Sequence, residues 1–171
     1  MQTRKIIVFL IVILATGALS ATQQQDEVPA DLKDKALHDA ACNKPDDAQN
    51  ADAPTLSALA IRVGGRQPGT IVQVQGSCHC QGDNCDTLVY LRSGDQYRLA
   101  LKEKYASLHP MKIVKQGMPS LTGEFKVDAA RMETTVYDWN GKEYKPSLCA
   151  TIIKGIKLPR ITRHACKEPT Q

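Results

Sequence analysis

The pattern of apolar and polar positions predicts a chain built largely of β-strands. Residues 70–75 are rich in β-branched side chains and alternate through Val72 and Val74, which is typical of a strand. Two more apolar runs follow, at 87–92 and 96–101, and a Ser-Gly-Asp segment joins them. This arrangement predicts a hairpin that lies directly after the strand.

Tyr97, Leu99 and Leu101 alternate along the second run, so we expect them to share one face and to form the core side of the hairpin. A second hairpin is predicted at Asn140-Gly141, because a type I′ turn needs two residues with positive φ and Asn-Gly adopts them readily.

Helical spacing is clearest near the beginning of the chain. Apolar residues recur on one face of residues 29–42, Pro29 suits the first turn of a helix, and Asp31 and Asp34 lie near its positive end. We therefore predict an amphipathic helix there. Residues 55–60 are interpreted as a short helical turn, and residues 102–109 as a helical turn or a loop.

Together these elements predict an α+β fold. We expect an N-terminal helix packed on one twisted antiparallel sheet of about five or six strands, stapled by disulfides. The length of 171 residues suits one domain.

The first 21 residues have the pattern of a secretory signal peptide. Arg4 and Lys5 precede an apolar run that is short for a membrane span, and small residues follow it. We expect cleavage there, no stable membrane anchor afterwards, and a periplasmic or secreted product. Residues 22–28 would then be a flexible lead, and 29–171 a single globular domain.

Charge argues against a nucleic-acid partner. The whole chain carries 22 basic and 18 acidic residues, and loss of Arg4 and Lys5 leaves 20 against 18, a net charge of +2. Such a small excess of positive charge gives only weak electrostatic attraction to a phosphate backbone. Residues 141–171 are nevertheless basic, with seven bases and two acids.

Six cysteines behind an export signal indicate a disulfide framework. Cys80 and Cys85 are close enough to close a tight turn. We also predict Cys42–Cys78 and Cys149–Cys166, which would tie the two ends of the domain to its centre, although fifteen connectivities are formally possible.

Cys78, His79 and Cys80 are the residue types that bind zinc or copper, so a metal site at this cluster is the alternative interpretation. Adjacent residues converge poorly on one ion, and export favours disulfides over metal ligation. We therefore expect no metal and no other cofactor.

The chain contains no Gly-rich phosphate loop, no Gly-x-Ser-x-Gly and no His-Glu-x-x-His motif. Aromatic and basic side chains cluster around the two hairpins instead, and these types dominate protein interfaces. The predicted binding surface consists of Tyr90, Arg92, Tyr97, Trp139 and Lys142.

The Cys-x4-Cys turn at 80–85, the strand after it and the later Tyr-Asp-Trp-Asn-Gly-Lys-Glu-Tyr segment resemble a loosely defined group of secreted bacterial proteins. The resemblance covers residues 76–149. It implies an envelope location and a β-rich fold, and no activity. The chain departs from the pattern at Gln81, where a glycine is usual, and in its additional Cys78-His79.

These observations predict an exported, non-catalytic envelope protein that binds another protein or a cell-wall component. An inhibitor or immunity protein against a wall-degrading enzyme is the sharpest form of this hypothesis. The alternatives are a periplasmic metal-binding protein that uses the Cys78-His79-Cys80 cluster and, third, an exported hydrolase.

Overall fold

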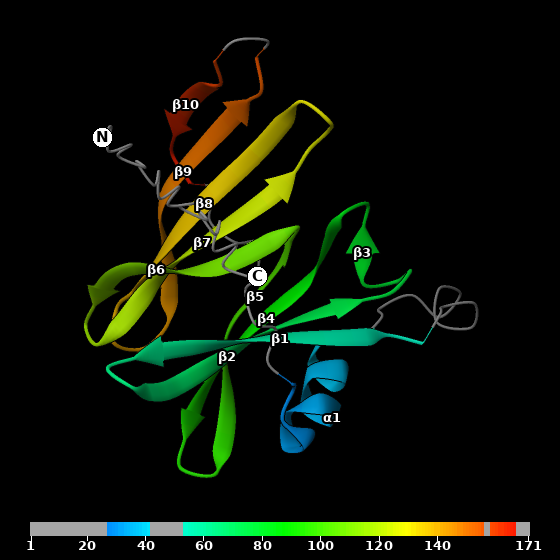
Figure 1. The fold of residues 1–171 in the computed structure, drawn as a ribbon, viewed down its shortest axis with the longest axis vertical. Helices are drawn as coiled ribbons and strands as arrows, with labels where there is room; N and C mark the ends of the chain where they lie inside the picture. The colour runs from blue at the N-terminus through cyan, green and yellow to red at the C-terminus, as the bar shows by residue number, and fades with distance from the viewer. Residues whose placement is uncertain (1–26, 42–52, 156–157, 167–171) are drawn as a thin grey trace, which may run out of the picture.

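A computed structural model describes residues 27–41, 53–155 and 158–166. These residues form two antiparallel β-sheets, with one short helix on the outer face of the first sheet (Figure 1). The predicted signal peptide lies outside the described residues, as does most of the predicted flexible lead. Val28, at the end of that lead, is buried, so the core begins one residue before the predicted boundary.

The protein is mostly β, with two sheets where the sequence predicted one. Sheet A contains β1 (Thr55–Val63), β2 (Arg66–Gln75), β3 (Cys80–Gln81), β4 (Asn84–Ser93) and β5 (Gln96–Tyr105). Sheet B has the order β10-β9-β8-β7-β6 and contains β6 (Ser107–Lys115), β7 (Met118–Lys126), β8 (Arg131–Trp139), β9 (Tyr144–Ile153) and β10 (Arg160–His164).

Helix α1 (Ala30–Asp39) is shorter than the predicted 29–42. Pro29 is its N-cap and Ala40 its C-cap. Leu32 and Ala36, one helical turn apart, are fully buried against sheet A. The predicted packing of a helix on a sheet is therefore confirmed, with a helix of only ten residues.

A second core fills the space between the sheets, and β4 contributes to both cores. Leu88 and Tyr90 face α1, whereas Val89 and Leu91 face sheet B, and all four are buried. Because both faces of this strand are covered, its sequence is an almost continuous apolar run.

The predicted core face of the first hairpin is divided by a β-bulge. The pairing of Val89 with Leu101 is followed by that of Tyr90 with Leu99, so one extra residue separates the two pairs. Tyr97 and Leu99 therefore pack in the core beneath α1, whereas Leu101 packs between the sheets. The hairpin itself is confirmed, and the single shared face is wrong.

The sequence predicted a short helical turn at residues 55–60, but these residues belong to the strand β1. Leu56 and Ala58 pack beneath α1, and Leu59 and Ile61 pack between the sheets. Apolar residues on both faces of this strand imitate helical spacing over a short window.

Residues 102–109 are also strand, where the sequence predicted a helical turn or a loop. They include the end of β5 and the start of β6, with Ala106 between them. The backbone N–H of Ala106 donates to the carbonyl of Glu124 on β7, at 2.8 Å. The chain therefore passes from sheet A into sheet B without leaving extended structure.

The hairpin predicted at Asn140-Gly141 is confirmed, since β8 pairs with β9 and Trp139 lies opposite Tyr144. Its turn differs from type I′, because in that pair only Gly141 has a positive φ, of 94°. Asn140 acts through its side chain: Oδ1 accepts hydrogen bonds from the backbone N–H groups of Lys142 and Glu143, both at 2.9 Å.

In the described ranges, no helix is long and apolar enough to cross a bilayer.

Candidate functional site

The cysteine-rich segment forms a tight clip at the beginning of β4. Cys80 lies opposite Cys85, their Cα atoms are 3.9 Å apart, and a disulfide joins them. Gly82, with a φ of 61°, provides the turn between them. This is the pairing that the five-residue spacing predicted.

The clip fastens sheet A to sheet B through Asn84. Its side-chain Nδ2 donates to the carbonyl of Lys126 at 2.8 Å, and its Oδ1 accepts from the N–H of the same residue at 2.7 Å. The Asn84 amide therefore takes the place of a strand partner at the end of β7.

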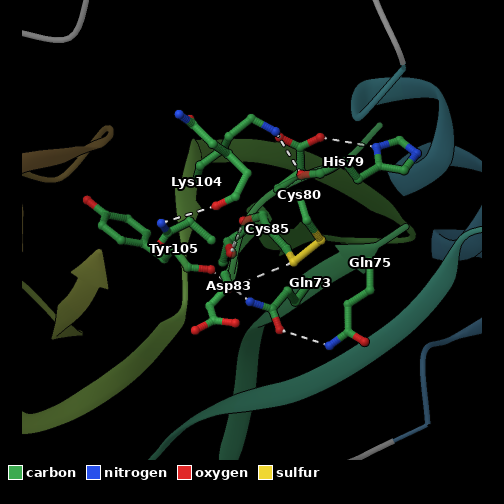
Figure 2. The surroundings of a disulfide bond; sticks show 12 residues. Gln73, Gln75, His79, Cys80, Asp83, Cys85, Lys104 and Tyr105 are labelled. Atoms are coloured by element: carbon green, nitrogen blue, oxygen red, sulfur yellow. Dashed lines mark hydrogen bonds and ion pairs between the residues drawn. A yellow bond between two sulfur atoms is a disulfide. The ribbon is translucent and has the colours of Figure 1, made fainter. Parts of the chain in front are cut away.

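His79 lies beside the clip in a buried polar cluster (Figure 2). Its Nδ1 is 3.1 Å from Oδ2 of Asp86, and the Lys104 ammonium donates to Oδ1 of Asp86 and to the His79 carbonyl, both at 2.7 Å. Both carboxylate oxygens of Asp86 thus have partners, as buried charges require. These contacts hold the Cys78-His79 turn against β4 and β5.

The geometry does not favour the metal-site alternative. Cys80 is bonded to Cys85 and Cys78 is also disulfide-bonded, so neither sulfur is a thiolate. No cluster of three or more metal-ligating side chains occurs in the part of the chain that the structure describes. The predicted partner of Cys78, Cys42, lies outside the described residues.

A second disulfide joins Cys149 on β9 to Cys166, just beyond β10, again as the sequence predicted. Cys149 pairs with His164 across the two strands. Nε2 of His164 lies 3.3 Å from the Thr151 hydroxyl, which further links β10 to β9.

Two residues of the predicted binding surface belong to the core. Tyr90 is fully buried beneath α1, where its hydroxyl donates to Oδ2 of Asp39 at 2.9 Å. Burial raises the pKa of the Asp39 carboxyl, but hydrogen bonds led by that of Tyr90 outweigh it and leave the pKa below its usual value. Trp139 is buried between the sheets and packs against Tyr144, with ring centroids 5.2 Å apart.

The other three residues of that prediction remain near one end of the sandwich. Arg92 and Lys142 are exposed, and Tyr97 is partly buried. The turns β1–β2, β4–β5, β6–β7 and β8–β9 meet at this end, which we call the four-turn end. Figure 1 shows three of them, β1–β2, β6–β7 and β8–β9, together on the left.

Contacts between the turns make the four-turn end one continuous surface. Nη2 of Arg98, from β5, donates to the carbonyl of Lys142 in the β8–β9 turn at 2.9 Å. The same guanidinium lies 5.9 Å from the centroid of the Trp139 ring, at cation–π distance. Gln116, in the β6–β7 turn, lies against Gly141.

A hollow of about 390 Å³ lies at the four-turn end. Arg66 from the start of β2 and Arg92 from the end of β4 line it, together with the backbone of Gly94 and Gly117. Among the described residues neither arginine forms an ion pair, although Arg92 Nε donates to the Gly94 carbonyl at 3.2 Å. The hollow therefore presents two guanidinium groups to solvent.

The acids near the four-turn end are mostly neutralised. Asp138 is paired with Lys115, and Glu143 with Lys145. Among the described residues at this end, Arg62, Arg66, Arg92, Arg98 and Lys142 are also exposed, together with one further acid, Asp95. Sequence reasoning found Arg92 and Lys142 and missed Arg66, whose position beside Arg92 depends on how the turns converge.

A tyrosine pair lies between the sheets. The hydroxyls of Tyr105 and Tyr137 are 2.6 Å apart and the rings meet edge to face. Burial, followed by the hydrogen bond with Tyr105, holds the pKa of Tyr137 far above its usual value. The pair stays protonated at neutral pH and contributes packing and a hydrogen bond to the core.

No protein-family model, no curated protein and no solved structure matches this chain.

Proposed function

We propose that this chain is an exported, non-catalytic envelope protein that binds an acidic site on another protein through its four-turn end. An inhibitor or immunity protein against a wall-degrading enzyme is the sharpest form of the proposal. The observation that carries it is the hollow in which Arg66 and Arg92 face solvent and form no ion pair with an acid of the described residues.

The arginines of this end are arranged for recognition. Guanidinium groups bind carboxylates through two parallel hydrogen bonds, which gives both affinity and orientation. Arg98 is held in advance by the Lys142 carbonyl and the Trp139 ring. A side chain that is already ordered loses less conformational entropy when a partner binds.

Wall-degrading glycosidases offer a matching surface. Such enzymes generally use a pair of carboxylates on either side of the bond that they cleave. A basic surface complements an acidic cleft, and complementary charge accelerates association in a salt-dependent manner. The two described disulfides are compatible with the oxidising compartment in which those enzymes act.

Titration of the purified protein against a panel of lysozyme-type and amidase-type enzymes tests the proposal. We expect inhibition of at least one enzyme, with an affinity that weakens as salt rises. The double variant Arg66→Gln/Arg92→Gln should weaken binding by about tenfold or more. It removes the arginine from each proposed charge pair and leaves the carboxylate of the enzyme unpaired in the interface.

The matched control is Arg160→Gln/Arg163→Gln. It removes two exposed arginines from β10, an outer strand of sheet B that takes no part in the four-turn end. This control should bind as the unmodified protein does. Equal binding by the Arg66→Gln/Arg92→Gln protein, or no inhibition of any enzyme in the panel, would count against the proposal.

A further inference from the structure

The β9–β10 hairpin forms a basic and apolar arm at the end of sheet B. All five residues of β10 are exposed, so neither face of this strand is covered. Figure 1 shows β10 at the end of the molecule remote from α1. The arm thus extends past the part of sheet B that sheet A covers.

Large apolar side chains are exposed on this arm. Leu158 is 82% exposed, Ile161 61% and Ile153 42%. They contribute nothing to either core, and three such residues within one hairpin are more than scattered surface apolar groups would give.

Bases accompany these side chains and acids do not. Lys154, Arg160 and Arg163 are exposed on the same hairpin. The sequence from 145 to 166 contains no aspartate or glutamate. Across the sheet, the exposed Glu133 on β8 lies opposite Thr151, and among the described residues it forms no ion pair with the bases of the arm. Asp128 is paired with Arg131. The arm therefore combines apolar groups with unneutralised positive charge.

Strand β10 is held to β9 by backbone pairing and a disulfide. Five consecutive residue pairs join β10 to β9, and the Cys149–Cys166 disulfide closes the end nearest the sandwich. The backbone N–H of Lys154 donates to the carbonyl of Ala130 at 2.8 Å, which supports β9 beside the β7–β8 turn. The ladder consequently fixes the backbone positions of Ile153, Arg160 and Ile161, and that of Arg163 beside them.

We infer that the β9–β10 arm binds an anionic lipid surface. Attachment to a lipid interface requires two kinds of side chain. Apolar side chains enter the boundary between headgroups and acyl chains, and flanking lysine and arginine side chains contact anionic headgroups. Leu158 and Ile161 are the apolar side chains of the arm. Its basic side chains are Lys154, Arg160 and Arg163. This inference stands independently of the proposed function, which uses the four-turn end.

Co-sedimentation with vesicles tests it. The protein should bind vesicles of phosphatidylcholine and phosphatidylglycerol, and bind pure phosphatidylcholine far more weakly. The triple variant Lys154→Gln/Arg160→Gln/Arg163→Gln should lower the partition coefficient about a hundredfold, since each base contributes about fivefold near an anionic surface. Raising salt from about 0.1 M to about 1 M should have a similar effect, because the screening length falls from about 10 Å to about 3 Å.

The apolar part is tested by Leu158→Ser/Ile161→Ser, which should lower binding by about tenfold or more. A matched control is Ile113→Ser/Val114→Ser, which alters two apolar residues that are each 53% exposed on β6. The control should bind like the unmodified protein. Neither change touches a buried side chain, and an unchanged near-ultraviolet spectrum of Trp139 confirms the fold.

Three results would overturn the inference. One is equal binding to neutral and anionic vesicles, and another is an equal loss of binding in the Ile113→Ser/Val114→Ser control. The third is binding to soluble polyglutamate that matches vesicle binding and is unaffected by Leu158→Ser/Ile161→Ser, which would identify the arm as a site for acidic polymers.

Discussion

At the scale of single residues, Gly123 on β7 makes room for the ring of Tyr105. A Cβ atom at position 123 would lie 2.6 Å from Cζ of that ring. Movement of the ring away from position 123 would cost free energy, because its hydroxyl forms a hydrogen bond with the hydroxyl of Tyr137. Gly123→Ala should therefore lower the free energy of unfolding by about 1–3 kcal/mol, measured by urea denaturation.

A double-mutant cycle separates this contact from a general effect of alanine in the strand. In a Tyr105→Ala background the ring is absent, and Gly123→Ala should then cost close to nothing. An equal cost in both backgrounds would show that the contact with Tyr105 is not the cause.

Asp138 on β8 predicts a pH dependence at the same scale. Hydrogen bonds from Lys115 and then Ser120 hold the pKa of this carboxyl below its usual value. A depressed pKa in the folded state means that the stabilisation is present above the unfolded pKa of about 3.9, and is lost as pH falls through the folded value. Asp138→Asn should thus destabilise the protein at pH 6, with a smaller difference near pH 2.

The free energy of unfolding, measured at several pH values for both proteins, checks this expectation. Glu143→Gln provides the control, because that carboxylate forms a more exposed pair with Lys145 and should change stability by less than about 1 kcal/mol. A constant difference between the unmodified protein and Asp138→Asn from pH 6 to pH 2 would contradict the assignment.

At the scale of elements, the sequence predicted strands where β-branched residues are dense or where turn residues mark the ends. The hairpins around Gly94 and Gly141 were found for this reason. The strand β1 was missed because Leu56 and Ala58 contact α1 while Leu59 and Ile61 contact the other core. A strand covered on both faces lacks clear alternation, and residues 55–60 also contain only one β-branched residue, whereas the predicted strand at 70–75 is rich in them.

The β-bulge in β5 and the passage into β6 have no clear local signal. One extra residue shifts Leu101 to the opposite face from Leu99, and a sequence pattern records only the spacing between them. Gln73 on β2 donates its side-chain amide to the carbonyl of Tyr105, at 3.0 Å, where the chain leaves sheet A (Figure 2). That contact joins residues 32 positions apart, and a local sequence pattern does not record contacts over such a separation.

The residues of the candidate site were likewise predicted where a local signal, such as a turn, marks them. Arg92 and Lys142 were predicted because each lies beside a recognisable turn. Tyr90 and Trp139 were included with them because their residue types favour interfaces, but the same large rings fill the two cores. Burial of an aromatic residue is decided by the second sheet and the helix, so sequence alone could not separate core from surface here.

At the scale of the whole molecule, sheet A separates the two cores, and the Asn84 clip ties it to sheet B. The two hydrogen bonds between the Asn84 amide and the Lys126 backbone lie at the end of the sandwich opposite the four-turn end. Lys126 also pairs with Asp83 in the clip, but that pair is exposed and contributes little. The buried Asn84 amide therefore links the two sheets at this end.

Asn84→Ala leaves the N–H and carbonyl of Lys126 without these partners, and should lower the free energy of unfolding by about 1–3 kcal/mol. Trp139, the single tryptophan, lies between the sheets and reports on that core by fluorescence, while circular dichroism reports on the strands of both sheets. If the sandwich unfolds as one unit, both signals should shift together to a lower urea midpoint. Unchanged stability in Asn84→Ala would show that the clip does not hold the sheets together.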